Sequence, residues 1–187
     1  MKSIKKRSLP FEKKVDLIEE KIEELELEEF SESNKNEIEK LRTQKNKELE
    51  RIYKALSRWE TVQVARHLDR PKTPDIVRQL IPNYITFSGD RLFRDDPAIY
   101  SAMGSFHGQN LMIIGHDRGN STKEKIKNNF GMANPEGYHK AIRLMRLAEK
   151  FRSPILTLID TQGAYPGIKA EEMGQSAAIA MNLRDMF

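Results

Sequence analysis

Glycine and proline are distributed unevenly along this chain of 187 residues, and that distribution constrains its fold more than any other feature. All ten glycines lie after residue 88, and Pro10 is the only proline before residue 71. The first 58 residues instead contain 15 Lys and Arg and 14 Asp and Glu. A charged stretch with so few helix breakers is either a solvated helix or disordered, and its apolar periodicity decides between them.

The apolar residues of this charged stretch follow helical spacing. One seam runs through Val15, Ile18, Ile22 and Leu25, and a second through Ile38, Leu41, Leu49, Ile52, Leu56 and Trp59. Polar residues 31–34 separate the two seams and can cap the second helix. Because each seam is narrow, neither helix is stable alone. We therefore expect residues 1–60 to form an antiparallel helical hairpin that packs on itself and on the rest of the chain or another subunit, as an assembly element.

A basic arm at the N-terminus raises the alternative of a polyanion site, formed by Lys2, Lys5, Lys6 and Arg7. The acidic run over residues 19–29 neutralises its neighbourhood, and aromatic side chains that could stack on bases are missing. The net charge is only +4. We expect a solvated face, with neither nucleic acid nor membrane as a partner. No apolar run is long enough for a bilayer or a secretion signal, so we expect a cytoplasmic protein.

Residues 61–187 carry the pattern of alternating helices and strands. Thr73 and Pro74 begin a short predicted helix, and β-prone runs over 98–106 and 111–116 flank a glycine turn, as in a hairpin. Asn134 and Pro135 begin another helix. The sequence therefore predicts an α/β fold for this second domain.

The end of the chain supplies the most informative pattern. The apolar run 155–159 predicts a strand covered on both faces, as in parallel sheets. A helix is expected over 170–186, with Met173, Ala177, Ala180 and Leu183 along one side. Between them, residues 160–167 read Asp-Thr-Gln-Gly-Ala-Tyr-Pro-Gly. Ligands of open α/β sheets collect at such strand ends, and glycine lets a ligand approach the backbone. This loop either faces a ligand or is a structural turn.

Side chains suited to catalysis are sparse. The chain has no cysteine, which excludes a thiol nucleophile and a cysteine-ligated metal, and its four histidines lack metal-type spacing. Asp160 is either a general base or, as we favour, a cap of the turn that follows it. The basic region at 118–127 either meets an anion or is a solvated face.

Three long motifs carry a family resemblance. Residues 130–141 read Phe-Gly-Met-Ala-Asn-Pro-Glu-Gly-Tyr-His-Lys-Ala, the loop at 160–167 follows, and residues 170–176 read Ala-Glu-Glu-Met-Gly-Gln-Ser. In this order they resemble the α subunit of the bacterial acetyl-CoA carboxylase carboxyltransferase. The resemblance extends over nearly the whole chain, including its N-terminal helical pair.

The resemblance implies a crotonase-like ββα superhelix, present here in part, preceded by the hairpin. It also implies transfer of a carboxyl group from carboxybiotin on a biotin carboxyl carrier protein to acetyl-CoA, which gives malonyl-CoA for fatty acid synthesis. The implied partners are a β subunit that carries a zinc ribbon, in an α2β2 heterotetramer, and biotin carboxylase. Biotin is the implied cofactor, and no metal is expected in this chain.

The resemblance also assigns the site residues. It places Gly163, Ala164, Tyr165, Pro166 and Gly167 on the biotin side of the active site, none of them catalytic. Gly115 and the 131–137 segment also match family motifs. For these residues a structural role is at least as well supported as a role in the active site. The oxyanion-stabilising backbone amides are expected beyond Phe187.

Two departures from the family accompany the match. Gln162 replaces a usual proline, which loosens the turn. The chain is also shorter than the members of the family, which have roughly 300 residues, near the upper size of a single core. We therefore expect this chain alone to be inactive. The alternatives are a non-catalytic assembly module of the same complex or another crotonase-fold acyl-CoA enzyme.

Overall fold

A computed structural model describes residues 8–28 and 31–186, which form two compact units. The units are Met1–Arg70 and Pro71–Phe187, whereas the sequence placed the division after residue 60. The basic arm at residues 2–7 and Phe187 lie outside the described residues. Each unit is described by itself.

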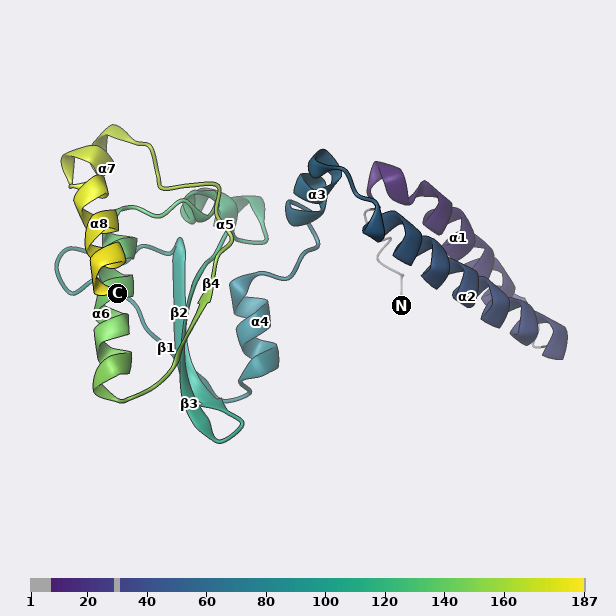
Figure 1. Cartoon of the computed structure of the whole chain (residues 1–187), viewed down its shortest axis with the longest axis horizontal. Coiled ribbons are helices and arrows are strands. Elements are labelled where there is room, and N and C mark those ends of the chain that lie inside the picture. The colour runs from purple at the N-terminus through teal and green to yellow at the C-terminus, as the bar shows by residue number, and fades with distance from the viewer. Residues whose placement is uncertain (1–7, 29–30, 187) are drawn as a thin grey trace. The chain divides into compact units, whose positions relative to one another are not determined.

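The first unit contains the predicted helical hairpin (Figure 1). Helix α1 (Lys13–Leu27) buries Val15, Ile18 and Ile22 and packs on α2 (Glu32–Lys54) after the short 3-10 helix η1 (Pro10–Glu12). Ion pairs join Glu19 to Lys45 and Glu26 to Arg42, so the two helices run antiparallel. At α2, the Ser31 hydroxyl accepts a hydrogen bond from the backbone N–H of Asn34, as the predicted cap requires.

The second apolar seam is not one helix, which corrects the sequence prediction. Helix α2 ends at Lys54, and α3 spans Arg58–Ala65. Ser57 and Glu60 stop the continuation because they form a reciprocal capping box: each side chain accepts a hydrogen bond from the other's backbone N–H. Trp59 therefore starts a new helix, where it is 65% exposed.

The second unit is built on a four-stranded sheet in the order β1-β2-β3-β4. The predicted hairpin is present as β2 (Ile99–Phe106) and β3 (Gln109–His116), paired antiparallel. Strand β4 (Ile155–Leu158) runs parallel to β3, with Ile113 opposite Leu156. Strand β1 (Tyr84–Thr86), which the sequence analysis missed, pairs with β2.

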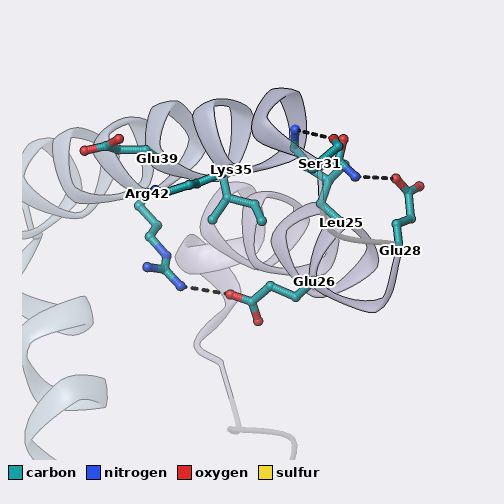
Figure 2. Close-up of a pocket in the computed structure, with 9 residues that line it drawn as sticks. Leu25, Glu26, Glu28, Ser31, Lys35, Glu39 and Arg42 are labelled. Atoms are coloured by element: carbon teal, nitrogen blue, oxygen red, sulfur yellow. Dashed lines mark hydrogen bonds and ion pairs between the residues drawn. The ribbon is translucent and has the colours of Figure 1, made fainter.

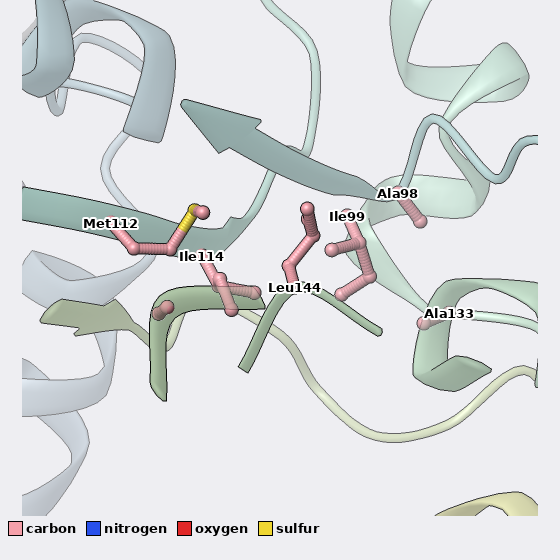
Figure 3. Close-up of a cluster of buried hydrophobic side chains, with 7 residues drawn as sticks. Ala98, Ile99, Met112, Ile114, Ala133 and Leu144 are labelled. Carbon is pink, nitrogen blue, oxygen red and sulfur yellow. The ribbon is translucent and has the colours of Figure 1, made fainter. Parts of the chain in front are cut away.

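Helices cover both faces of this sheet (Figure 1). Helix α4 (Thr73–Leu80) lies on one face, where Val77 and Ile81 pack against Ile113 and its neighbours. Helix α6 (Pro135–Lys150) lies on the other, where Leu144 and Ala148 belong to the same core cluster as Met112 and Ile114. Figure 3 shows Leu144 among these core residues. Alternate residues of β3 thus serve opposite cores. The predicted α/β class is confirmed, and β2, β3 and α6 make one ββα unit.

Shorter elements connect these layers. Helix α5 (Thr122–Lys127) and the 3-10 helix η2 (Asn129–Gly131) lie between β3 and α6, and α7 (Ile168–Glu172) and α8 (Gln175–Asp185) follow β4. Helix α8 packs on α6.

Two predictions about the last elements need correction. Strand β4 is not covered on both faces: it lies at the edge of the described sheet, and Ile155 is 40% exposed. The helix expected over 170–186 is broken at Gly174, whose φ of 82° is left-handed. The packed face of α8 carries Ala178 and polar side chains, so the predicted apolar stripe faces outward, with Leu183 57% exposed.

No helix in the described ranges 8–28 and 31–186 is both long and apolar enough to cross a membrane.

Candidate functional site

The parallel pairing of β3 with β4 brings two separately predicted segments to one edge of the sheet. Both strands end there: β3 leads into Asp117 and Arg118, and β4 leads into the loop at 160–167. This is the edge at which open α/β sheets bind ligands. The sequence alone does not relate the two segments, because it does not specify which strands pair.

The glycine loop itself is fastened at its middle and open near its start. The Tyr165 backbone N–H donates to the Ala133 carbonyl at 3.0 Å. Gly163 is exposed, and a Cβ built on it meets no atom within 4 Å. A ligand therefore has unobstructed access to the backbone there. Of the five residues predicted for this loop, Gly163 and Pro166 are exposed, whereas Ala164, Tyr165 and Gly167 are half-buried.

Asp160 does not take the capping role that the sequence favoured. The Thr161 hydroxyl accepts the hydrogen bond from the Gly163 N–H at 3.1 Å and donates to the Gly163 carbonyl at 2.8 Å. The Asp160 carboxylate instead pairs with Arg118 at 3.5 Å, and both side chains are about three-quarters buried. The turn is thus held by a neutral hydroxyl, and the charge of Asp160 is directed at a cation.

Gln162, which stands where the family usually has proline, reaches across the loop. Its side-chain Nε2 donates to the Met132 sulfur at 3.3 Å. This contact ties the loop to the 131–137 segment at a second point. It replaces part of the rigidity that the proline ring would have supplied.

Two residues that sequence reasoning missed lie at the same edge. The Thr73 hydroxyl donates to the His116 carbonyl at 2.6 Å and so attaches the start of α4 to the end of β3. This attachment leaves the preceding Lys72 only 6% exposed. Within the described part of the chain its ammonium has no hydrogen bond or ion pair. The sequence signals Thr73 only as the start of a helix and does not signal Lys72, because only the fold brings them to the site.

Burial shifts the pKa values of Lys72 and of His116. Burial lowers the pKa of Lys72, although the charge of Asp160 partly opposes the shift. Burial also lowers the pKa of His116, against the Leu158 carbonyl and Asp160. Its ring Nδ1 is buried without a partner among the described residues. This edge of the sheet therefore disfavours added positive charge.

Buried charges from the segment before β2 and from α6 hold the 131–137 segment. The Asp96 carboxylate accepts from the backbone N–H groups of Ala98, at 2.9 Å, and Asn134, at 2.7 Å. Burial nevertheless raises the pKa of Asp96. Lys140, 2% exposed, donates to Asp95 at 2.6 Å and to the Asp96 carbonyl at 2.7 Å. Because Asn134 directly follows Ala133, this cluster fixes the carbonyl on which the glycine loop rests.

Gly115, which the resemblance also singled out, has a structural role. Gly115 is buried in β3, between Thr73 and Leu158. In the described ranges, no three His, Cys, Asp or Glu side chains are grouped so that they could hold a metal ion.

A pocket at the end of the hairpin has no comparable chemistry (Figure 2). It opens between α1 and α2 and is lined mainly by charged side chains, several already paired. Arg42 donates to Glu26 at 2.8 Å, and Asn34 donates to Glu28 at 3.1 Å. These contacts stabilise the hairpin, so the edge of the sheet remains the candidate site.

Comparison with known proteins gives a consistent set of relatives. A family model described as acetyl co-enzyme A carboxylase carboxyltransferase-like matches residues 8–187. The acetyl-coenzyme A carboxylase carboxyl transferase subunit alpha of Geobacter metallireducens is 52% identical over 179 residues, covering 95% of this chain and 56% of the relative. The subunit of the same name from Fusobacterium nucleatum is 48% identical over 182 residues, 95% of this chain and 58% of that protein. The chain thus spans little more than half the length of these relatives.

Among solved structures, a transcarboxylase 12S crystal structure aligns with a TM-score of 0.48 at 11% identity. The alignment covers 94% of this chain and 30% of that one.

A glycine substitution tests how tightly the site is packed. Gly131 and Gly108 share a φ of 81°, but a Cβ on Gly131 would lie 2.8 Å from Arg118 Cγ and 2.9 Å from the Asp160 carbonyl, whereas one on Gly108 meets nothing. We expect Gly131→Ala to lower the free energy of unfolding by about 1–3 kcal/mol more than Gly108→Ala does, because only the first adds overpacking to backbone strain. Urea denaturation measures the free energy of unfolding of both variants. Equal losses of stability would contradict the prediction, because they would show that Arg118 and Asp160 move away from the added methyl group without cost.

The burial of Lys72 predicts a pH dependence of stability. Because its pKa is lowered on folding, the unfolded chain holds the proton more strongly, and stability contributed by this group rises with pH up to the unfolded pKa of about 10.4. Lys72→Met should remove that rise, which the wild-type chain shows as the pH increases toward about 10.4. Urea denaturation across this range, with the exposed Lys169→Met as control, measures the slopes. Parallel slopes for the wild-type and Lys72→Met chains would contradict the prediction.

Proposed function

The chain belongs to the acetyl-coenzyme A carboxylase carboxyltransferase-like family, and we propose that it supplies the α-subunit side of a biotin-dependent carboxyltransferase. The proposed reaction moves a carboxyl group from carboxybiotin to acetyl-CoA and yields malonyl-CoA, a step of fatty acid synthesis. The observation that carries the proposal is the family match over residues 8–187, together with about half of the residues identical to named α subunits.

The loop residues suit the group that this proposal requires. Biotin presents a flat polar ureido ring on an apolar body, and the loop offers accessible backbone at Gly163 beside the apolar Ala164, Tyr165 and Pro166. Gly167 keeps the loop narrow, since a Cβ there would overlap the Tyr165 ring. Carboxybiotin, when bound, supplies the carboxyl group that is transferred.

The chain's own residues then act by position more than by proton transfer. Asp160 is neutralised by Arg118, and the loop is held by Thr161 and by the Ala133 carbonyl. Preorganised backbone groups are effective at stabilising developing negative charge because they need not reorient during the reaction. We therefore assign no catalytic side chain to the described residues.

We further propose the partners that such a reaction needs. They are a zinc-ribbon-bearing β subunit in an α2β2 heterotetramer, a biotin carboxyl carrier protein and biotin carboxylase, all in the cytoplasm. The helical hairpin supports an assembly role, because α2 has no buried residue and α1 leaves Leu17 and Leu27 exposed.

The first test introduces a methyl group where the ligand should approach. The complete α polypeptide carrying this sequence, assembled with the β subunit and given carboxybiotinylated carrier protein, should form malonyl-CoA. Gly163→Ala should lower kcat/KM by about tenfold or more, since its Cβ meets no protein atom but occupies the access to the backbone. Gly108→Ala, another positive-φ position on a distant turn, is the control and should keep full activity. No malonyl-CoA from the wild-type assembly would refute the function, and an unchanged Gly163→Ala would refute the placement of the site.

The second test concerns the hairpin. Removal of residues 1–70, the first compact unit, should weaken co-purification with the β subunit because the proposed assembly surface is lost. Circular dichroism of the truncated chain verifies that the sheet unit keeps its secondary structure. Equal recovery of the β subunit by the full and the truncated chains would exclude the assembly role.

A further inference from the structure

The residue after the break between α7 and α8 is turned inward toward the glycine loop. Gly174, with a φ of 82°, ends the first helix, and α8 starts at Gln175. A continuous helix would have carried this side chain in another direction. Instead Gln175 is only 3% exposed, one of the most buried polar residues in the second unit.

Gln175 joins three segments through a single amide. Its Nε2 donates to the Ala133 carbonyl at 2.9 Å and to the Tyr165 carbonyl at 3.0 Å. The Tyr165 backbone N–H also donates to the Ala133 carbonyl. Tyr165 is thus held by both of its backbone polar groups, one directly and the other through Gln175. The middle of the loop cannot shift without breaking one of these bonds.

The orientation of the amide is determined by these neighbours. Both groups facing it are carbonyls, which accept and cannot donate, so the NH₂ group must point at them. The opposite atom, Oε1, is left buried with no partner among the described residues. A buried acceptor without a hydrogen bond is unfavourable. The side chain therefore makes its two bonds to Ala133 and Tyr165 at the cost of leaving its own oxygen without a partner.

We propose that Gln175 is a positioning residue for the carboxyl-transfer site. It holds the Tyr165 carbonyl and thereby keeps the backbone from Gly163 to Gly167 in the shape that substrate meets. Its effect on catalysis rests on the proposed function, but its effect on the loop does not. Its side chain acts through the loop and does not itself touch substrate.

The same helix supplies a matched control. Asn182 in α8 is also a partly buried amide, and its Nδ2 donates to two backbone carbonyls, those of Tyr138 at 3.0 Å and Ala178 at 2.9 Å. The bond to Tyr138 attaches α8 to α6, and the bond to Ala178 lies within α8, so neither touches the loop. Gln175→Leu and Asn182→Leu therefore each remove two amide hydrogen bonds from one helix, and only the first removes support from the loop.

Hydrogen–deuterium exchange of the full chain tests the positioning directly. Peptides that cover residues 160–168 should exchange about tenfold or more faster in Gln175→Leu, because the bond of the Tyr165 N–H opens more often. They should exchange at the wild-type rate in Asn182→Leu. The amide of Gln175→Asn is one methylene too short to reach both carbonyls. Its exchange rates provide a second test of the proposal if the leucine variant folds poorly. Unchanged exchange in both Gln175 variants, or equal acceleration in Asn182→Leu, would overturn the proposal.

The kinetic measurement uses the assembled enzyme. Gln175→Leu should lower kcat by about 10- to 100-fold with the KM for acetyl-CoA unchanged, since a small misplacement of a site is enough for such a loss. Asn182→Leu should keep the wild-type kcat. Faster loop exchange with an unchanged kcat would overturn the positioning role. A wild-type assembly without carboxyl transfer would refute the proposed function. The hydrogen–deuterium exchange rates would then still show whether Gln175 holds the loop.

Discussion

The carbonyl of Ala133 is the point on which the candidate site depends. It accepts hydrogen bonds from the Tyr165 backbone and from Gln175, and so connects the start of α6 to the glycine loop and to α8. Its own position is fixed by the next residue, Asn134, whose N–H is held by the buried Asp96. A loop that must be open to a ligand cannot be stabilised by burial, and hydrogen bonds from behind are the alternative that leaves its front accessible.

Holding Ala133 requires charge to be buried, which is costly unless each charge is paired. The second unit meets this condition with short contacts: Lys140 donates to Asp95 and to the Asp96 carbonyl, and Glu136, 1% exposed, accepts from Arg94 at 2.8 Å. These groups come from one face of α6 and from the segment before β2. They convert an irregular connection into a rigid support, because any displacement would leave a buried charge unpaired.

Local signals in the sequence predicted the parts of this structure that depend on neighbouring residues. The hairpin followed from apolar spacing, the β2–β3 pair from a glycine turn, and the start of α6 from Asn134 and Pro135. Errors arose where a single residue overrode the periodicity, at the Ser57 capping box and at Gly174. The glycine loop was recognised from its motif. Its support by Gln175 was not, since this side chain reaches the loop only through helix packing, which one sequence does not specify.

The charges around the loop also limit what chemistry its side chains can perform. Asp160, the most plausible base by position, is paired with Arg118 at 3.5 Å, so its charge faces a cation of the chain itself. Burial disfavours the protonated forms of Lys72 and His116, so neither is well suited to carry a proton to a ligand. With these groups restrained, the accessible main chain at Gly163 is what the site offers to a ligand. A reaction that needs placement and fixed dipoles fits such a surface better than one that needs an acid–base pair.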